Sequence, residues 1–252
     1  NAELDCLPQQ LITNNMFLSE IQKGGRSITI LDVLSNSNTV FRFAPSPSGH
    51  LHIGHFVPLI MNILLRSVSL HYGKSSQFIF RIDDTNPNED DFSSVIKESL
   101  QKIMGSSFEN VIETRSSVLS PKIIDLIDNS IMNTDDNKFY VDVSDQTTIK
   151  SQRIHKQESI YRNISLDETR SLWNKMKSGE LTNAVVRAKI DMQSENGNLR
   201  DPVMLRYVSN KIIMPTYDLV CPVLDSFDSL IGDNSILIAM RDCNYYNRHE
   251  QY

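Results

Sequence analysis

The chain has 252 residues, of which 40% are hydrophobic and 22% charged, and its formal net charge is −6. These values indicate a soluble globular protein with one large domain or two modest ones. They exclude a disulfide-framed scaffold, because the three cysteines (Cys6, Cys221 and Cys243) are scattered without a CxxC pair. No apolar stretch reads as long enough to span a bilayer, so we expect a cytoplasmic protein without a membrane partner.

Residues 39–114 alternate between strand and helix patterns, after a polar lead segment, Asn1–Asn38, of uncertain order. Alternation of this kind predicts a parallel α/β sheet. The expected elements are the strand Val40–Ala44, the helix His55–Tyr72, the strand Gln77–Asp83, the helix Asp90–Met104 and a short apolar segment at residues 111–112.

A loop rich in Pro, Ser and Gly joins the first strand to its helix and ends in two histidines, His52 and His55. Backbone N–H groups, the positive end of the helix dipole and two imidazoles would face one spot, which suits a phosphate-bearing ligand. A side chain at Gly54 would hold that ligand away from the backbone. A metal site that includes His50 is the weaker alternative, because no HExxH frame or cysteine pair accompanies it.

The second strand ends in two carboxylates, Asp83 and Asp84, followed by a Thr-Asn-Pro turn. Polar side chains at the carboxyl end of such a strand lie where ligands bind in open α/β sheets. Taken alone, the same residues also fit helix capping and turn formation.

Residues 115–211 hold fifteen Lys and Arg against thirteen Asp and Glu, whereas the rest of the chain has ten against eighteen. Within Ser151–Lys189 there are eight basic residues against four acidic ones. This local excess fits a surface that follows nucleic-acid phosphates, and equally a solvated helix face. The expected elements are the helices Lys122–Met132 and Leu166–Lys177, the strands Phe139–Val143 and Ala184–Met192, and then a strand-like apolar run, Pro215–Leu224.

Five stretches carry a family resemblance. They are RFAPSPSGHLHIGH (residues 42–55), FRIDDTNP (80–87), VRAKIDM with LRDPV (186–203), PTYDLVCPVLDS (215–226) and NRHEQY (247–252). Together they resemble the class I aminoacyl-tRNA synthetases, specifically the glutamyl-tRNA synthetases of the archaeal and eukaryotic cytosolic kind. The resemblance implies a Rossmann-like parallel nucleotide-binding sheet, residues 39–114 and 212–252, interrupted at 115–211 by a mixed α/β insert that binds the tRNA acceptor end.

The resemblance also implies an aminoacyl-tRNA ligase that uses ATP with Mg²⁺, L-glutamate and tRNA(Glu), with no structural metal. His52 and His55 would be catalytic, stabilising charge on the ATP phosphates. Arg42 would receive the γ-carboxylate of glutamate, and Asp83 would bind its α-ammonium group. The implied ATP-binding residues are His52, Gly54, His55 and Asn244. The implied substrate-binding residues are Arg42, Ala44, Ser46, Asp83, Tyr217, Cys221 and Arg241, and the implied tRNA-binding residues are Arg187, Lys189 and Arg200.

Glutaminyl-tRNA synthetases are the near alternative, since their first signature usually reads PPEPNGYLHIGH and they carry Met at the position of Thr216. The Ala-Pro-Ser-Pro-Ser-Gly loop and Thr216 therefore favour glutamate. The chemistry agrees, because a carboxylate calls for a charge-assisted, bidentate donor such as Arg42.

Departures from the family pattern keep other readings open. The stretch Phe227–Met240 is several residues longer than the family's link, and Asn244 stands where the family has glutamate. Residues 175–178 (KMKS) lie in a helical pattern and read as a solvated helix end rather than as the family's lysine loop. We therefore expect a catalytic-domain fragment, with synthetase-complex partners reached through sequence on its N-terminal side. A synthetase-like protein that binds or modifies tRNA is the other alternative, while small HxGH nucleotidyltransferases share only the histidine loop.

Overall fold

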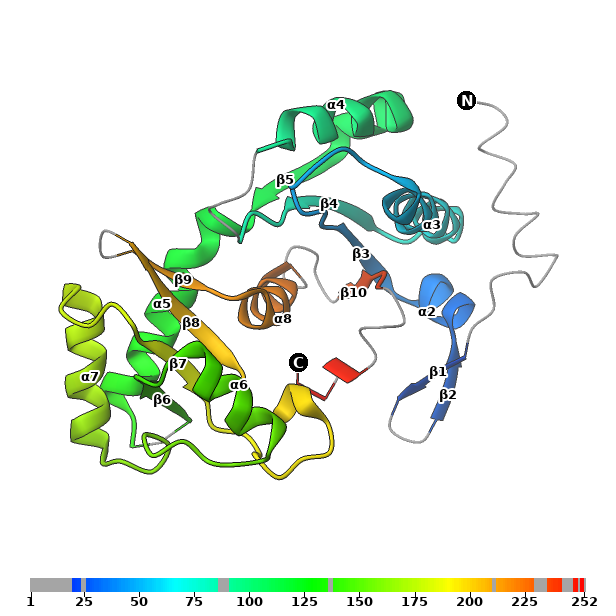
Figure 1. The fold of residues 1–252 in the computed structure, drawn as a ribbon. Coiled ribbons are helices and arrows are strands. Elements are labelled where there is room, and N and C mark those ends of the chain that lie inside the picture. The colour runs from blue at the N-terminus through cyan, green and yellow to red at the C-terminus, as the bar shows by residue number, and fades with distance from the viewer. Residues whose placement is uncertain are drawn as a thin grey trace. The chain divides into compact units, whose positions relative to one another are not determined.

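The computed structural model describes residues 20–23, 26–85, 91–135, 138–209, 212–228, 235–241, 247–248 and 250–251. The chain divides into two compact units, whose elements are labelled in Figure 1. The first unit comprises Asn1–Ser116 with Asp225–Arg241, and the second comprises Ser117–Leu224 with Asp242–Tyr252. The domain division expected from the sequence, with boundaries at 38/39, 114/115 and 211/212, stays a prediction.

The first unit is built on a four-stranded parallel sheet with the strand order β10-β3-β4-β5 (Figure 1). Its strands are β3 (Asn38–Phe43), β4 (Ser76–Ile82), β5 (Val111–Arg115) and β10 (Ser235–Ala239). The other elements are the hairpin β1 (Glu20–Lys23) and β2 (Arg26–Thr29), the helices α2 (Ile30–Asn36), α3 (Ile53–His71) and α4 (Ser93–Met104), and the 3-10 helix η1 (Gly105–Asn110). The predicted α/β fold with a Rossmann-like parallel sheet is confirmed.

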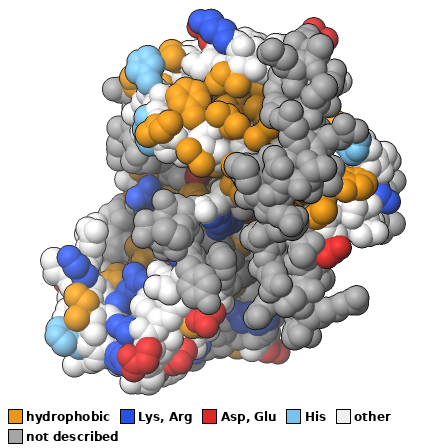
Figure 2. Space-filling model, turned by 90° about the vertical axis from the view of Figure 1, so that its right-hand side faces the viewer, with side chains coloured by type: hydrophobic (Ala, Val, Ile, Leu, Met, Phe, Trp, Pro, Cys, Tyr) orange, Lys and Arg blue, Asp and Glu red, His pale blue; other side chains and the backbone are white. Residues whose placement is uncertain are grey.

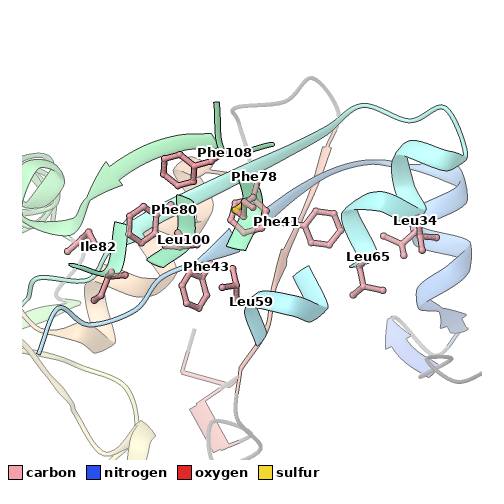
Figure 3. Close-up of a cluster of buried hydrophobic side chains, with 13 residues drawn as sticks. Leu34, Phe41, Phe43, Leu59, Leu65, Phe78, Phe80, Ile82, Leu100 and Phe108 are labelled. Atoms are coloured by element: carbon pink, nitrogen blue, oxygen red, sulfur yellow. The ribbon is translucent and has the colours of Figure 1, made fainter. Parts of the chain in front are cut away.

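One face of the parallel sheet packs against helices and forms the core of the first unit (Figure 3). Core residues at most 4% exposed include Phe41, Phe43, Phe78, Phe80 and Leu59. Leu34 of α2 belongs to the same cluster, so the segment expected only as a polar lead contributes to the core. Because successive side chains of a strand point to opposite faces, Arg42 and Arg81 point away from this cluster.

The second unit contains an antiparallel sheet with the strand order β6-β7-β8-β9. Its strands are β6 (Phe139–Asp142), β7 (Val185–Ala188), β8 (Val203–Ser209) and β9 (Ile212–Pro215), and its helices are α5 (Ser116–Asn133), α6 (Gln146–Ile154), α7 (Leu166–Ser178) and the 3-10 helix η2 (Gly197–Leu199). β7 is shorter than the expected strand Ala184–Met192: it ends at Ala188, and the chain bends at Ile190. Residues 175–178 do end a helix, with Gly179 in the left-handed conformation after it.

The prediction that Pro215–Leu224 is strand-like is wrong, because the helix α8 (Tyr217–Asp228) follows β9 directly. Thr216 begins the helix: its carbonyl accepts the N–H groups of Leu219 and Val220, at 3.1 and 2.9 Å. A short apolar run cannot be assigned to strand or helix from its periodicity alone.

The helix α3 has 19 residues and, by length and composition alone, is apolar enough to cross a membrane. This contradicts the expectation that no apolar stretch reaches that length. On its sheet side, however, the buried Asn62 donates to the Arg42 carbonyl (3.2 Å), as a packed core helix would. Its outer side carries the exposed residues Ile53, Val57 and Ile60, and the face drawn in Figure 2 also shows apolar side chains gathered together.

Candidate active site

Three arginines lie at the carboxyl ends of adjacent parallel strands in the first unit. Arg42 of β3 is opposite Ile79 of β4, so Arg81 follows two residues further along and shares a face of the sheet with Arg42. Ala239 of β10 is also opposite Arg42, and Arg241 follows two residues after it. Open α/β sheets bind their ligands at this edge.

All three arginines contact the carboxylate of Asp225, in the last turn of α8. Arg42 approaches side-on, with Nε 2.9 Å from Oδ1 and Nη2 2.9 Å from Oδ2. Arg81 Nη2 lies 2.7 Å from Oδ1, and Arg241 Nη2 lies 2.8 Å from Oδ2. The four side chains are between 2 and 15% exposed. We call these four residues the arginine cluster.

Three guanidiniums share the carboxylate of Asp225. Burial acts to raise the pKa of Asp225, but Arg42 and Arg81 overcome that effect and lower it. Asp225 is therefore ionised at neutral pH. Several guanidiniums together at the ligand-binding edge of the sheet can receive a carboxylate.

Asp83 follows β4 beside the arginine cluster. Its Oδ1 atom is buried and accepts no hydrogen bond from the described residues. Burial raises the pKa of the Asp83 carboxyl to about 6, although Arg81, the Ser116 hydroxyl and Arg42 act to lower it. A cationic group placed against Oδ1 would relieve this cost of burial.

His52 and His55 lie together at the start of α3. His52 caps the helix, because its Nδ1 accepts the N–H of Gly54 (3.1 Å), and its own N–H donates to His55 Nδ1 (3.3 Å). The two ring centroids are 4.0 Å apart. Burial, followed by the charge of His52, lowers the pKa of His55. The N–H groups of the first turn and two imidazoles therefore meet at one helix end, as expected from the sequence.

Gly54 is required here for a reason that the sequence did not show. A Cβ atom at this position would lie 3.0 Å from His52 Cε1 and 3.1 Å from His52 Nδ1. That is tighter than ordinary van der Waals contact, so the capping imidazole would have to shift by a few tenths of an ångström to admit a side chain. The glycine thus protects the cap directly.

The loop between β3 and α3 contains Ala44 and Ser46, both half-buried. Two backbone bonds hold the loop: the Asp83 N–H donates to the Pro45 carbonyl and the Phe92 N–H to the Pro47 carbonyl, each at 3.0 Å. His50 contacts Phe92 edge-on instead of joining the other two histidines. The described residues contain no group of three His, Cys, Asp or Glu suited to a metal ion, and the expected lack of a structural metal stays a prediction.

The family model of class I tRNA synthetases (E and Q), catalytic domain, matches residues 38–252. The chain belongs to this synthetase family.

Curated relatives of this synthetase chain are similar along most of its length. The probable cytoplasmic glutamate–tRNA ligase of Enterocytozoon bieneusi is 32% identical, covering 96% of this chain and 37% of its own length. The cytoplasmic glutamate–tRNA ligase of Arabidopsis thaliana is 33% identical (84% of this chain, 29% of its own). The bifunctional glutamate/proline–tRNA ligase of Mus musculus is 31% identical (84% and 14%). The chain thus spans about a third or less of the length of these relatives.

Two of the residues that we expect to bind tRNA in this synthetase chain, Arg187 and Arg200, make internal contacts in the second unit, and their tRNA contacts stay a prediction. Arg187 is fully buried, with Nη1 2.8 Å from Asp142 Oδ2 and Nε donating to the Asp201 carbonyl (2.8 Å). Arg200 donates to three backbone carbonyls, at 2.7 to 3.0 Å. Lys189 is half-buried, and burial lowers its pKa.

Three further predicted site residues of the synthetase, Tyr217, Cys221 and Asn244, are not members of the arginine cluster. Tyr217 and Cys221 are four residues apart on α8, and Cys221 is a buried free cysteine. Asn244 lies outside the described residues, as do Asn86 and Pro87 of the second motif and the middle of Phe227–Met240.

Sequence reasoning missed two members of the arginine cluster, Arg81 and Asp225, although both stand in quoted motifs. For Arg81 a signal existed: it is the one charged residue among the apolar residues of β4 (SQFIFRI). An arginine that stands between buried apolar residues of a strand is itself buried and needs a carboxylate to pair with its charge. For Asp225 there was none, because the run that precedes it was read as a strand.

Proposed function

We propose that the full protein is a glutamate–tRNA ligase, which activates L-glutamate with ATP and transfers it to the 3′-terminal ribose of tRNA(Glu). One observation carries the proposal: the arginine cluster and a histidine-capped helix start occur in one unit, at the carboxyl ends of β3 and β4. The first suits a dicarboxylic amino acid and the second suits a triphosphate.

For the amino acid, we assign the carboxylate contacts to Arg42 and Arg241 and the α-ammonium contact to Asp83. The buried, hydrogen-bond-free Oδ1 of Asp83 supports this, since an ammonium group would supply the missing donor. The remaining proposed pocket residues are Ala44, Ser46, Tyr217 and Cys221.

For ATP, we assign the phosphate contacts to His52, His55 and the backbone at Gly54, with Asn244 as a further contact. The lowered pKa keeps His55 neutral near pH 7, where its Nδ1 accepts the His52 N–H. An incoming triphosphate would raise that pKa and favour the imidazolium, which can donate to a phosphate oxygen.

Activation then needs no side-chain nucleophile. An oxygen of the α-carboxylate attacks the α-phosphorus, the bond from that phosphorus to the bridging oxygen breaks, and pyrophosphate leaves with its Mg²⁺. The residues of this chain position the two substrates and stabilise the charge that moves onto pyrophosphate.

Transfer follows when a ribose hydroxyl of the tRNA attacks the glutamyl carbonyl and releases AMP. We propose that the second unit contacts the acceptor end, with Lys189 as a direct contact, and with Arg187 and Arg200 shaping the surface from within. We also propose a cytoplasmic location and partners in a synthetase complex. The cytoplasmic names of the relatives and the bifunctional mouse relative support these points.

Pyrophosphate exchange by the full-length protein tests the proposal, with glutamate or glutamine and with or without tRNA. We expect exchange that depends on glutamate and not on glutamine. Exchange with glutamine alone would move the assignment to the glutaminyl enzymes. No exchange, with tRNA binding retained, would favour a synthetase-like tRNA-binding or tRNA-modifying protein.

A further inference from the structure

Two residues of the arginine cluster, Asp225 and Arg81, have no role in the activity proposed above, and Asp225 contacts all three arginines. Its two carboxylate oxygens face four nitrogen atoms of three arginines, at 2.7 to 2.9 Å. Arg42 Nη2 donates to one carboxylate oxygen, and Arg42 Nε lies 2.9 Å from the other. Contact with both oxygens limits how the guanidinium of Arg42 can turn, and with it the directions of its other N–H groups.

Asp225 places its own carboxylate against the arginines that we expect to receive a substrate carboxylate. Two roles are open to it. It can stay in place as a support that orients the arginines, or it can occupy the substrate position and be displaced when the substrate binds. The burial of the cluster favours the support. Arg42 and Arg81 are 6 and 2% exposed at their side chains, and removing Asp225 would leave three guanidiniums together with little water around them. Stripping a buried charge network of one partner is strongly unfavourable.

We propose that Asp225 is a positioning residue that stays in place and aims Arg42, Arg81 and Arg241 at the substrate carboxylate. This inference rests on the proposed function, because it needs a carboxylate substrate. It assigns Arg81 a place in the same arrangement: Arg81 shares Oδ1 with Arg42, while Arg241 shares Oδ2 with it.

The chemistry of asparagine provides the sharpest variant. Asp225→Asn keeps the shape of the side chain but replaces one acceptor oxygen with an NH₂ donor. Whichever way the amide turns, it would place a donor against two guanidinium donors, so at least one arginine must turn away. Asp225→Ala instead leaves an opening of carboxylate size lined by three arginines, which formate can fill.

The experiment uses the full-length protein as wild type, Asp225→Asn, Asp225→Ala and, as matched control, Asp91→Asn. Asp91 is a carboxylate of the same unit that pairs with Arg115 at 3.2 Å, but its side chain is 59% exposed. Each protein is titrated calorimetrically with a non-hydrolysable glutamyl-adenylate analogue and separately with ATP. Thermal unfolding is then followed in sodium formate and in sodium chloride at equal ionic strength.

We expect Asp225→Asn to weaken analogue binding roughly ten- to a hundredfold, the range for a hydrogen bond to a charged group. ATP binding should be unchanged, and Asp91→Asn should bind both ligands as wild type does. Formate should raise the unfolding midpoint and the analogue affinity of Asp225→Ala, and should do neither for wild type or Asp225→Asn. If Asp225→Ala folds poorly, refolding that depends on formate carries the same test.

Wild-type analogue affinity in Asp225→Asn would overturn the inference. So would an equal loss of ATP and analogue affinity without any formate effect, because that is the behaviour of a purely structural residue. If the wild type itself fails to bind the analogue, the proposed function fails, and the wild-type titration tells that result apart from a failure of Asp225 alone.

Discussion

Buried arginines are paired differently in the two units. In the second unit the buried Arg187 pairs with Asp142 at 2.8 Å, and the partly exposed Arg162 pairs with Asp201 at 2.7 Å and with Glu158 at 3.1 Å. In the first unit three arginines share Asp225. Because breaking a buried ion pair is costly, we assign a structural role to Arg187 and Asp142, whereas we propose that the arginine cluster, at the ligand-binding edge of its sheet, also meets a ligand carboxylate.

The largest expected effect concerns the buried pair of Arg187 and Asp142 in the second unit. Asp142→Ala leaves Arg187 buried without its carboxylate and should lower the free energy of unfolding by about 3–5 kcal/mol. Denaturant unfolding measures it. Asp135→Ala is the control: that side chain is 96% exposed and pairs with Arg170 at 3.6 Å, so its loss should cost about 1 kcal/mol at most. A cost for Asp142→Ala as small as the control's would break the comparison.

The next effect concerns catalysis in the first unit. His52→Ala and His55→Ala should each slow adenylate formation by about 10²–10³, the usual cost of one preorganised charge-stabilising group. Glutamate binding should change little, because the histidines lie at the phosphate-binding helix start. His71→Ala, at the other end of α3, is the matched control. Near wild-type activation rates in both variants would remove the pair from the mechanism.

The buried carboxyl of Asp83 in the first unit should make the stability of the fold depend on pH. Its folded-state pKa is raised from 3.8 to about 6, so the folded protein holds this proton more tightly than the unfolded chain does. Its ionisation therefore destabilises the fold as pH rises from about 4 through about 6, and has no such effect below pH 4. Asp83→Asn should accordingly raise the free energy of unfolding at pH 7.5, by up to roughly 3 kcal/mol at about 1.4 kcal/mol per pKa unit, and not below pH 4.

The same variant should lose glutamate binding, and wild-type glutamate affinity should fall as pH drops through about 6, since only the carboxylate pairs with an ammonium group. Unfolding curves and glutamate titrations at the two pH values check both statements. Equal stability of Asp83→Asn and wild type at pH 7.5 would show that the carboxylate is not buried as described.

The smallest expected effect concerns the cap of α7, which we compare with the histidine cap of α3. Ser165 and Glu168 cap α7 reciprocally, as His52 and His55 cap α3. Ser165→Ala should cost about 1 kcal/mol of stability, the usual value for a lost cap, and leave activation unchanged. Calorimetric unfolding and pyrophosphate exchange measure the two quantities. A loss of activation comparable with that of His52→Ala would show that capping alone accounts for the histidine effect.

The strands and helices around the histidine loop could be predicted because their signals are local. β3, α3 and β4 follow from apolar patterns interrupted by a Pro/Gly loop, and the loop resembles a family signature. The pairing of Arg42 with Asp225 could not be predicted, because those residues are 183 positions apart, one on β3 and the other on α8. The helix α8 was misread for a different reason, since its apolar run is too short to show a period.

The same limit explains why the internal contacts of Arg187 and Arg200 could not be predicted. In the sequence, Arg187 and Arg42 look alike, since each is an arginine at a strand beside a family motif. Only the fold shows that Asp142 balances Arg187 within its own sheet, from the neighbouring strand β6. Charge in a sequence therefore predicts a binding surface only after the internal partners are known.

The central claim is that Arg42, within the arginine cluster, binds a carboxylate of glutamate. Calorimetric titration of the full-length protein with a non-hydrolysable glutamyl-adenylate analogue, and with its glutaminyl counterpart, tests this most directly. We expect wild type to prefer the glutamyl analogue, and Arg42→Ala to lose about 2–5 kcal/mol of binding and most of that preference. Arg206→Ala, an exposed arginine of β8, should bind as wild type does. Unchanged affinity and preference in Arg42→Ala would contradict the account.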